Sequence, residues 1–155
     1  MQAKKGSESL ITEVSHQSMA TQFVVLLPGR WADRVEIAVA ALEKLDSIER
    51  RLTIYQSDGE VARANQHAHD RPFALSLATF ELIQQANVWS ERTNGAFDIT
   101  AGPLVEVWGF TQRSGKKPSQ AEVSAALGRV GYQHLRRSAD DQTIQFTRPG
   151  MSINL

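Results

Sequence analysis

One carboxylate stands out in the most apolar long stretch of the chain, which runs from Asn94 to Phe110. Asp98 lies there between Phe97 and Ile99, and burying a carboxylate among such neighbours is costly unless hydrogen bonds or a cation compensate it. An ionised carboxylate only accepts hydrogen bonds. Two roles therefore remain open for Asp98: it caps a turn or a helix start, or it receives donor groups of a ligand.

The residues around this carboxylate predict how it is positioned. Asn94–Gly95 ends a helical pattern, because glycine is favoured just past a helix end. That glycine and Ala96 carry almost no side chain, so the backbone there can approach a ligand closely. Pro103 is typical of the first turn of a new helix. Leu104 and Trp108 lie one turn apart and are expected to bury that helix.

Apolar periodicity predicts the elements that carry this stretch. Helices are expected over residues 33–51, 57–65, 76–93 and 119–130, and strands over residues 19–27, 134–137, 143–147 and 151–155. Ser57 with Glu60, and Ser119 with Glu122, have the spacing of a capping box. The helix from Ser76 is expected to bury an apolar stripe that includes Trp89.

Composition excludes several classes of function. The 155 residues contain 17 Lys and Arg and 17 Asp and Glu, so the net charge is zero. No basic face is built, which argues against a nucleic-acid partner. Cysteine is absent, and with it disulfides, thiolate nucleophiles and zinc–thiolate sites. No window of 18 apolar residues exists, so no membrane-spanning segment is predicted.

Two further segments are not expected to carry function. Residues 1–13 are polar, have no apolar core and do not resemble a secretory signal peptide, so we expect a frayed tail and a cytoplasmic protein. Residues 14–155 form the expected domain.

His67 and His69 could share a face only on an extended strand, and a third metal ligand is not identifiable. An exposed loop is therefore favoured there over a metal site.

Three blocks of the sequence resemble the ApbE-type flavin transferases, which are FAD:protein FMN transferases. The blocks are Met19–Thr21, the segment Glu49–Asn65, and the run Gly95–Thr100, Gly102–Leu104 and Trp108–Phe110. Departures are mild: Ala20 stands where glycine is usual, Thr53 where serine is usual, and Gly59 where another small polar residue is usual. The resemblance extends over residues 19–155 and covers only the amino-terminal half of the family.

The resemblance implies an α+β fold whose antiparallel strands and packed helices surround a flavin cleft. Such enzymes cleave FAD and attach FMN to a threonine hydroxyl of an acceptor flavoprotein, with AMP leaving and magnesium assisting. By position, the residues that match FAD-contacting residues of the family are Met19, Tyr55, Ala96, Phe97 and Asp98. The family is often exported, which this sequence does not indicate.

The resemblance supplies only part of such an enzyme. The family's glycine-rich segment and its magnesium-binding aspartate and threonine would follow Leu155, so no catalytic or metal residue is assigned in this chain. Met151, Ile153 and Leu155 alternate like a half-buried strand without its partner, which suggests a truncated chain that is inactive alone. Two alternatives remain: a non-catalytic flavin-binding or interaction fragment, or an unrelated α+β domain with an accidental match.

Overall fold

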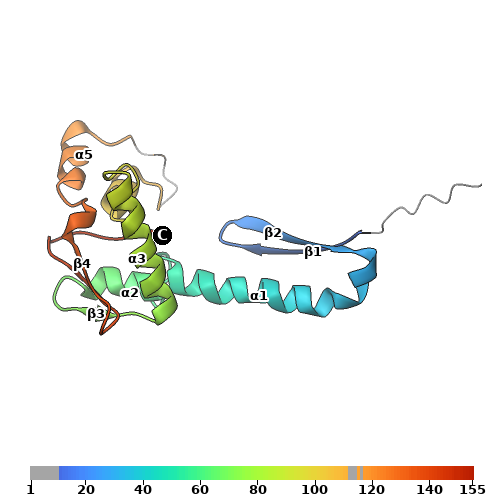
Figure 1. Ribbon diagram of the computed structural model, residues 1–155. Helices are drawn as coiled ribbons and strands as arrows, with labels where there is room; N and C mark the ends of the chain where they lie inside the picture. Colours follow the sequence, from blue (N-terminus) through green and yellow to red (C-terminus); the bar gives the residue numbers. More distant parts are fainter. Residues whose placement is uncertain (1–10, 112–114, 116) are drawn as a thin grey trace, which may run out of the picture. The chain divides into compact units, whose positions relative to one another are not determined.

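The computed structural model describes residues 11–111, 115 and 117–155 (Figure 1). The elements, in chain order, are β1 (Ile11–Ser18), β2 (Thr21–Pro28), η1 (Gly29–Arg34), α1 (Val35–Leu52), α2 (Glu60–His67), β3 (Phe73–Ala74), α3 (Leu77–Arg92), α4 (Gly102–Val107), α5 (Gln120–Leu127), η2 (Tyr132–His134), β4 (Leu135–Ser138) and β5 (Thr143–Phe146). The fold is α+β with antiparallel strand pairs, as the resemblance implies. Over the described ranges, no helix combines the length and the apolar composition needed to cross a bilayer.

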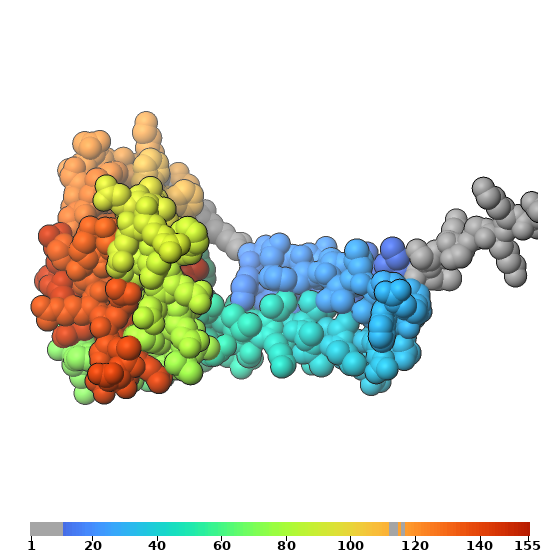
Figure 2. Space-filling model, viewed as in Figure 1, coloured from blue at the N-terminus to red at the C-terminus, as the bar shows by residue number. Residues whose placement is uncertain are grey.

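The chain divides into two compact units, which we call the hairpin unit (residues 11–50 of those described) and the core unit (residues 51–155). In the hairpin unit, β1 and β2 pair antiparallel from Ile11↔Pro28 to Ser18↔Thr21. Half-buried and exposed residues alternate along both strands, as in a sheet with one packed face. The hairpin lies alongside α1 within this unit (Figure 2).

The beginning of the hairpin differs from the sequence-based expectation. The structure places Ile11–Glu13 in β1, whereas these residues were expected in the polar tail; the rest of that tail lies outside the described residues. Met19 does not start a strand, because Met19 and Ala20 form the hairpin turn with φ of 52° and 58°. Two consecutive left-handed residues match the twist of a two-residue hairpin turn. The sequence shows no alternation of apolar and polar residues over β1, because polar residues such as His16 occupy its half-buried positions. This strand was therefore not predicted.

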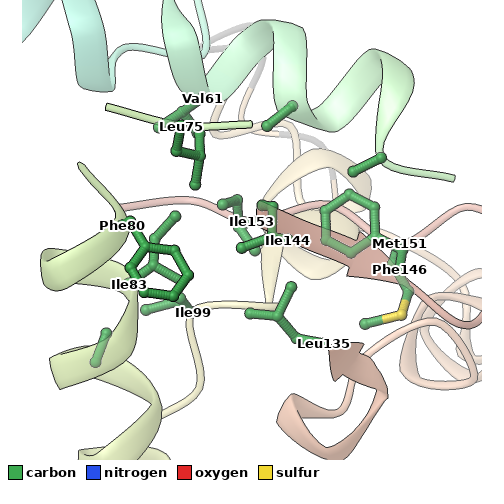
Figure 3. Packing of buried hydrophobic residues seen from close by; sticks show 13 residues of the cluster. Val61, Leu75, Phe80, Ile83, Ile99, Leu135, Ile144, Phe146, Met151 and Ile153 are labelled. Carbon is green, nitrogen blue, oxygen red and sulfur yellow. The ribbon is translucent and has the colours of Figure 1, made fainter. Parts of the chain in front are cut away.

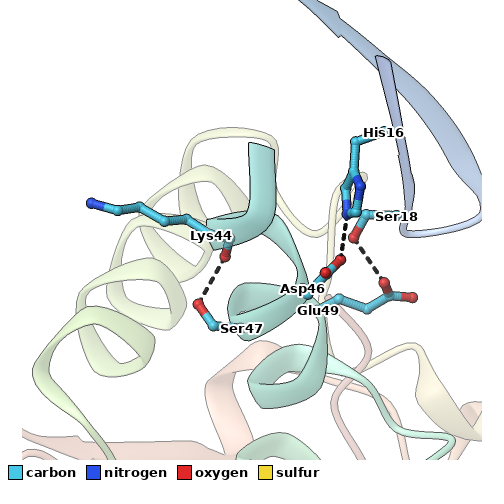
Figure 4. A network of polar contacts seen from close by, with 6 residues as sticks. All are labelled: His16, Ser18, Lys44, Asp46, Ser47 and Glu49. Atoms are coloured by element: carbon cyan, nitrogen blue, oxygen red, sulfur yellow. Dashed lines mark hydrogen bonds and ion pairs between the residues drawn. The ribbon is translucent and has the colours of Figure 1, made fainter. Parts of the chain in front are cut away.

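Polar side chains join the hairpin to the later turns of α1 (Figure 4). His16 Nε2 lies 2.7 Å from Asp46 Oδ1, and the Ser18 hydroxyl donates to Glu49 Oε2 over 2.8 Å. Hydrogen bonds from the Met19 backbone and from the Ser18 hydroxyl lower the pKa of the Glu49 carboxyl. A carboxylate on α1 therefore holds the hairpin turn in place.

In the core unit, β5 is the central strand of an antiparallel sheet ordered β3-β5-β4. The β4–β5 hairpin confirms the expected strand pair, with Leu135 opposite Phe146. Figure 3 shows side chains from α2, α3, the sheet and the C-terminal segment meeting in one cluster. Its buried members are Val61, Ala64, Ala68, Leu75, Phe80, Ile83, Ala86, Ile99, Leu135, Ile144, Phe146, Met151 and Ile153.

The last residues of the chain are held more firmly than expected for an unpartnered, half-buried strand. Met151 and Ile153 are 1% and 0% exposed. The Asn65 side chain donates from Nδ2 to the carbonyl of Ile153 over 2.9 Å, and its Oδ1 accepts the Ile153 N–H over 2.8 Å. Asn154 N–H donates to the Ile99 carbonyl over 2.9 Å. One amide side chain of α2 thus pairs this backbone as a neighbouring strand would.

Of the four helix starts expected at residues 33, 57, 76 and 119, the last two are confirmed, whereas residues 33 and 34 lie in η1 and α1 begins at Val35. Ser76 precedes α3, and Ser119 with Glu122 forms a complete capping box at α5. The expected box at α2 is wrong, because Gly59 is the residue before that helix and the Glu60 carboxylate turns to α3. Glu60 accepts hydrogen bonds from the N–H and hydroxyl of Ser76 and from the hydroxyl of Thr79.

These contacts determine the ionisation of Glu60. Burial acts to raise its pKa, but the hydrogen bonds from Thr79 and Ser76 outweigh burial and lower the pKa below its ordinary value. A negative charge at the first turn of α3 also interacts favourably with the helix dipole. Glu60 therefore links the start of α3 to α2.

Two apolar residues expected to be buried are exposed. Trp89 on α3 and Trp108 after α4 have exposed fractions of 54% and 41%. The buried side of α3 instead includes small and polar residues, namely Thr79, Asn87 and Ser90 among Phe80, Ile83 and Ala86. The helical period of the apolar residues predicts which side of a helix is buried, but the elements that pack against the helix decide how wide its buried face is.

Candidate functional site

The chain reverses direction sharply after α3, in the loop formed by residues 94–98. Asn94 and Gly95 both have positive φ, 52° and 81°. Gly95 N–H donates to the carbonyl of Ser90 over 2.8 Å, and Ala96 N–H donates to that of Thr93 over 3.1 Å. This pattern ends the helix as the sequence predicts. The loop is thus defined by backbone bonds and does not depend on long side chains.

Ala96 and Phe97 lie at the outer side of this loop. Both are exposed, and 47% of Phe97 is accessible. The Phe97 N–H donates to the hydroxyl of Thr93 over 3.1 Å, which fixes the backbone while leaving the ring free. An exposed aromatic ring beside a small residue offers a flat apolar surface to a planar ligand.

Asp98 is half-buried and bonded within the protein. Its Oδ1 accepts the N–H of Thr100 over 2.8 Å and the Thr100 hydroxyl over 2.7 Å. Its Oδ2 accepts the N–H of Tyr132 over 2.9 Å. The expected turn-capping role is therefore present. A carboxylate has about four acceptor positions, so the three bonds that it receives from the described residues leave about one, on Oδ2, for a further donor.

Thr100 connects this carboxylate to a distant part of the sequence. Its side chain is completely buried. The hydroxyl donates to Asp98 and accepts the N–H of Gly131 over 2.8 Å. Residues 131–132, which we call the 131–132 turn, are therefore held by two side chains of the loop region.

The 131–132 turn was not predicted as part of a site. Gly131 was expected only to end a helix, and it adopts φ of 148°. A Cβ placed on Gly95 would lie 3.5 Å from the Tyr132 ring, so that ring packs against the loop backbone. The contact joins positions far apart in the chain, and no periodicity or spacing rule connects them. A glycine followed by tyrosine is too common a pair to be a signal alone.

Tyr55 lies on another segment of the core unit, between α1 and α2. Its exposed fraction is 68%, and its N–H donates to the hydroxyl of Thr53 over 3.1 Å. That bond forms a local turn in which Thr53 uses the hydroxyl it shares with serine. The aromatic ring is therefore displayed to solvent and not used in the core.

Met19 belongs to the hairpin unit and not to the core unit. It is 39% exposed in the turn between β1 and β2, whose position is set by Glu49. Ala96, Phe97 and Asp98 are thus brought together in one loop, while Tyr55 and Met19 lie on separate segments. Four of the five are exposed and Asp98 is half-buried, so none of them belongs to the buried core.

The two histidines occupy aromatic surroundings. The His67 ring stacks on Phe73 at 6.3 Å between centroids, and His69 tilts against Phe146 at 5.0 Å. Within the described residues, no group of three His, Asp or Glu side chains has the geometry to hold a metal ion.

The family model and the individual relatives that match this chain point to the same family. The model of the ApbE family matches residues 16–155. The FAD:protein FMN transferase of Vibrio cholerae serotype O1 is 32% identical over 113 residues, covering 72% of this chain and 33% of that protein. The FAD:protein FMN transferase of Escherichia coli strain K12 is 29% identical over 159 residues, covering 99% of this chain and 45% of that protein.

Solved structures agree with these sequence matches. The ApbE protein of Thermotoga maritima aligns with a TM-score of 0.86 at 26% identity, covering 94% of this chain and 47% of that one. The flavin transferase ApbE from Vibrio cholerae aligns with a TM-score of 0.80 at 27% identity, covering 94% and 48%. The chain thus spans less than half the length of these proteins.

Proposed function

The chain belongs to the ApbE family, and from that membership we propose that it supplies the FAD-contacting part of an FAD:protein FMN transferase. The observation that carries the proposal is the match over residues 16–155 to a family whose relatives are named for this reaction. The loop at residues 94–98 supports it, because that loop combines an exposed aromatic ring, an accessible backbone and one free acceptor position on a carboxylate.

In the proposed complex, each of the five residues has a distinct role. Phe97 and Tyr55 provide aromatic surfaces for the flavin or the adenine. Ala96 allows the ligand to approach the backbone, and Asp98 Oδ2 accepts one donor from the ribose, ribityl or flavin groups. Met19 provides an adaptable apolar contact from the hairpin turn.

The proposed reaction is a transfer between oxygen atoms at phosphorus. The hydroxyl oxygen of an acceptor threonine forms a bond to the phosphorus of the FMN half, and the bond from that phosphorus to the bridging oxygen breaks. AMP leaves with the bridging oxygen, and the threonine proton passes to solvent or to a base. Such transfers depend chiefly on positioning and on stabilisation of charge. The residues described above contribute positioning.

The first test is FAD binding, measured by quenching of flavin fluorescence. Tyr55→Ala should weaken binding by about 1–3 kcal/mol, because an aromatic contact is lost. It should leave the free energy of unfolding nearly unchanged, since Tyr55 is 68% exposed. Trp89→Ala, at another exposed aromatic ring outside the matching blocks, is the matched control and should change neither. Equal effects of the two variants, or no FAD binding by the wild-type chain, would contradict the proposal.

The second test is transfer itself, followed by intact-mass analysis of an acceptor flavoprotein bearing the threonine. We propose that the 155 residues alone form no FMN adduct even with FAD and magnesium, since they span less than half of their relatives. Adding a polypeptide that corresponds to the remainder of a relative should restore the adduct. An adduct formed by the 155 residues alone would show that the chain is a sufficient catalyst.

A further inference from the structure

We infer that Thr100 is the positioning residue of the flavin-contacting loop, acting through Asp98 and the 131–132 turn. None of the residues matched to FAD contacts is Thr100, and its complete burial keeps it from touching a ligand directly. The inference rests on the proposed function, because it names how one of the proposed FAD contacts is oriented.

The direction of the Thr100 hydroxyl is determined by its two partners. The oxygen accepts the Gly131 N–H over 2.8 Å, so its own hydrogen is available for Asp98 Oδ1, 2.7 Å away. Threonine is stiff about χ1, which limits other arrangements. The hydroxyl therefore connects the backbone of the 131–132 turn to one defined oxygen of the carboxylate.

This arrangement decides which oxygen of Asp98 can meet a ligand. Oδ1 already accepts two hydrogen bonds from Thr100, whereas Oδ2 accepts one from Tyr132. The remaining acceptor position is on Oδ2. Without the Thr100 hydroxyl, Asp98 would keep only the bonds from the N–H groups of Thr100 and Tyr132, and its terminal torsion, which is a soft one, would hold Oδ2 less tightly.

The same hydroxyl also supports the loop backbone. The 131–132 turn carries the Tyr132 ring that packs beside Gly95, at 3.5 Å from an added Cβ. Loss of the Thr100 acceptor would leave the Gly131 N–H without this partner and loosen the turn. The ring and the loop that contains Ala96 and Phe97 would then lose a common support.

The experiment compares Thr100→Val with Thr100→Ser. Valine keeps the shape but removes the hydroxyl, so the dissociation constant for FAD should rise about tenfold, as expected for losing buried hydrogen bonds. Serine keeps the hydroxyl and should restore affinity to within about threefold. Fluorescence quenching of FAD measures both values.

A matched control separates positioning from general destabilisation. Thr79 is also a buried threonine (1% exposed) whose hydroxyl donates to a carboxylate, that of Glu60. Thr79→Val should destabilise the fold to a similar degree while leaving FAD affinity unchanged. An equal loss of FAD affinity in Thr79→Val and Thr100→Val would overturn the inference.

A measurement without ligand keeps the inference testable if FAD binding itself fails. Amide chemical shifts and hydrogen exchange of Gly131, Tyr132 and the 94–98 loop should change in Thr100→Val and return in Thr100→Ser. Such changes in a chain that does not bind FAD would support the role of Thr100 in ordering the 94–98 loop while refuting the proposed function. Unchanged loop amides in Thr100→Val would overturn the inference whatever the FAD result.

Discussion

The hairpin unit and the core unit bury their side chains to different degrees. Among the described residues of the hairpin unit, only Ser18, Ala38 and Leu42 are buried, and Leu26 remains 59% exposed. The core unit contains a contiguous cluster of thirteen buried apolar residues (Figure 3). A lone two-stranded hairpin is marginally stable. We therefore expect packing to dominate stability in the core unit and polar contacts to matter relatively more in the hairpin unit.

The largest expected effect is at Ile153, which is completely buried in the core unit. Ile153→Ala should reduce the free energy of unfolding by about 2–5 kcal/mol, because it removes buried methyl groups and leaves a cavity. Val24→Ala in the hairpin unit, where 44% of the side chain is exposed, is the control and should cost much less. Urea unfolding followed by circular dichroism measures both. Similar losses would show that the units do not differ as proposed.

The next effect concerns the Asn65 clamp on the backbone of Ile153. Asn65→Ala should cost about 1–3 kcal/mol, because it leaves a buried N–H and a buried carbonyl without their partner. Asn65→Asp keeps the acceptor for the N–H but loses the donor to the carbonyl, so its cost should differ from that of alanine. If the urea midpoint of Asn65→Ala equals that of the wild type, the hydrogen bonds of Asn65 do not hold the C-terminal segment.

A smaller, pH-dependent effect is expected at Glu60. Its pKa is lowered in the folded protein, so its stabilising contribution is present above its ordinary pKa and is lost as pH falls through the lowered folded value. Glu60→Gln should cost roughly 1 kcal/mol at neutral pH, as for loss of a helix cap. Urea unfolding between neutral and acidic pH should show the difference from wild type shrinking as Glu60 protonates. A difference that grows on acidification would contradict the sign.

The smallest effect is expected at Glu49 in the hairpin unit. Glu49→Gln should leave the midpoint of global unfolding unchanged, because the carboxylate lies at the surface and exposed charge contacts contribute little. It should instead accelerate hydrogen exchange of the Met19 amide, which donates to Glu49. In the wild type that protection should be lost as pH falls through the lowered pKa of Glu49. Unchanged Met19 exchange in the variant would show that Glu49 does not hold the turn.

Much of the core unit could be predicted from local patterns. The helix from Ser76, the capping box of Ser119 and the β4–β5 hairpin follow from residue spacing, which needs only contacts close in sequence. The hairpin unit was less predictable. Buried and exposed positions alternate along β1, but polar residues occupy several of the half-buried positions, so the residue types do not show it. The left-handed turn at Met19 and Ala20 is uncommon for residues other than glycine.

The residues of the candidate site also fall into those that the sequence pointed to and those that it did not. The blocks that resemble the family identified the stretch around Asp98 and the residue Tyr55. They did not identify Gly131 and Tyr132, whose contacts with Thr100 and Asp98 join positions more than thirty residues apart. Sequence spacing carries no information about pairs brought together only by folding.

The sequence by itself determined the α+β class, the main helix starts of the core unit and the family to which the chain belongs, because these depend on local periodicity and on strings of matching residues. Only the tertiary structure decided the partners of the buried polar groups. Glu60 caps α3 and not its own helix, Asn65 pairs the backbone of Ile153, and Thr100 meets Gly131. The physical reason is that a buried donor or acceptor must be satisfied, and several partners fit the sequence equally well until packing selects one.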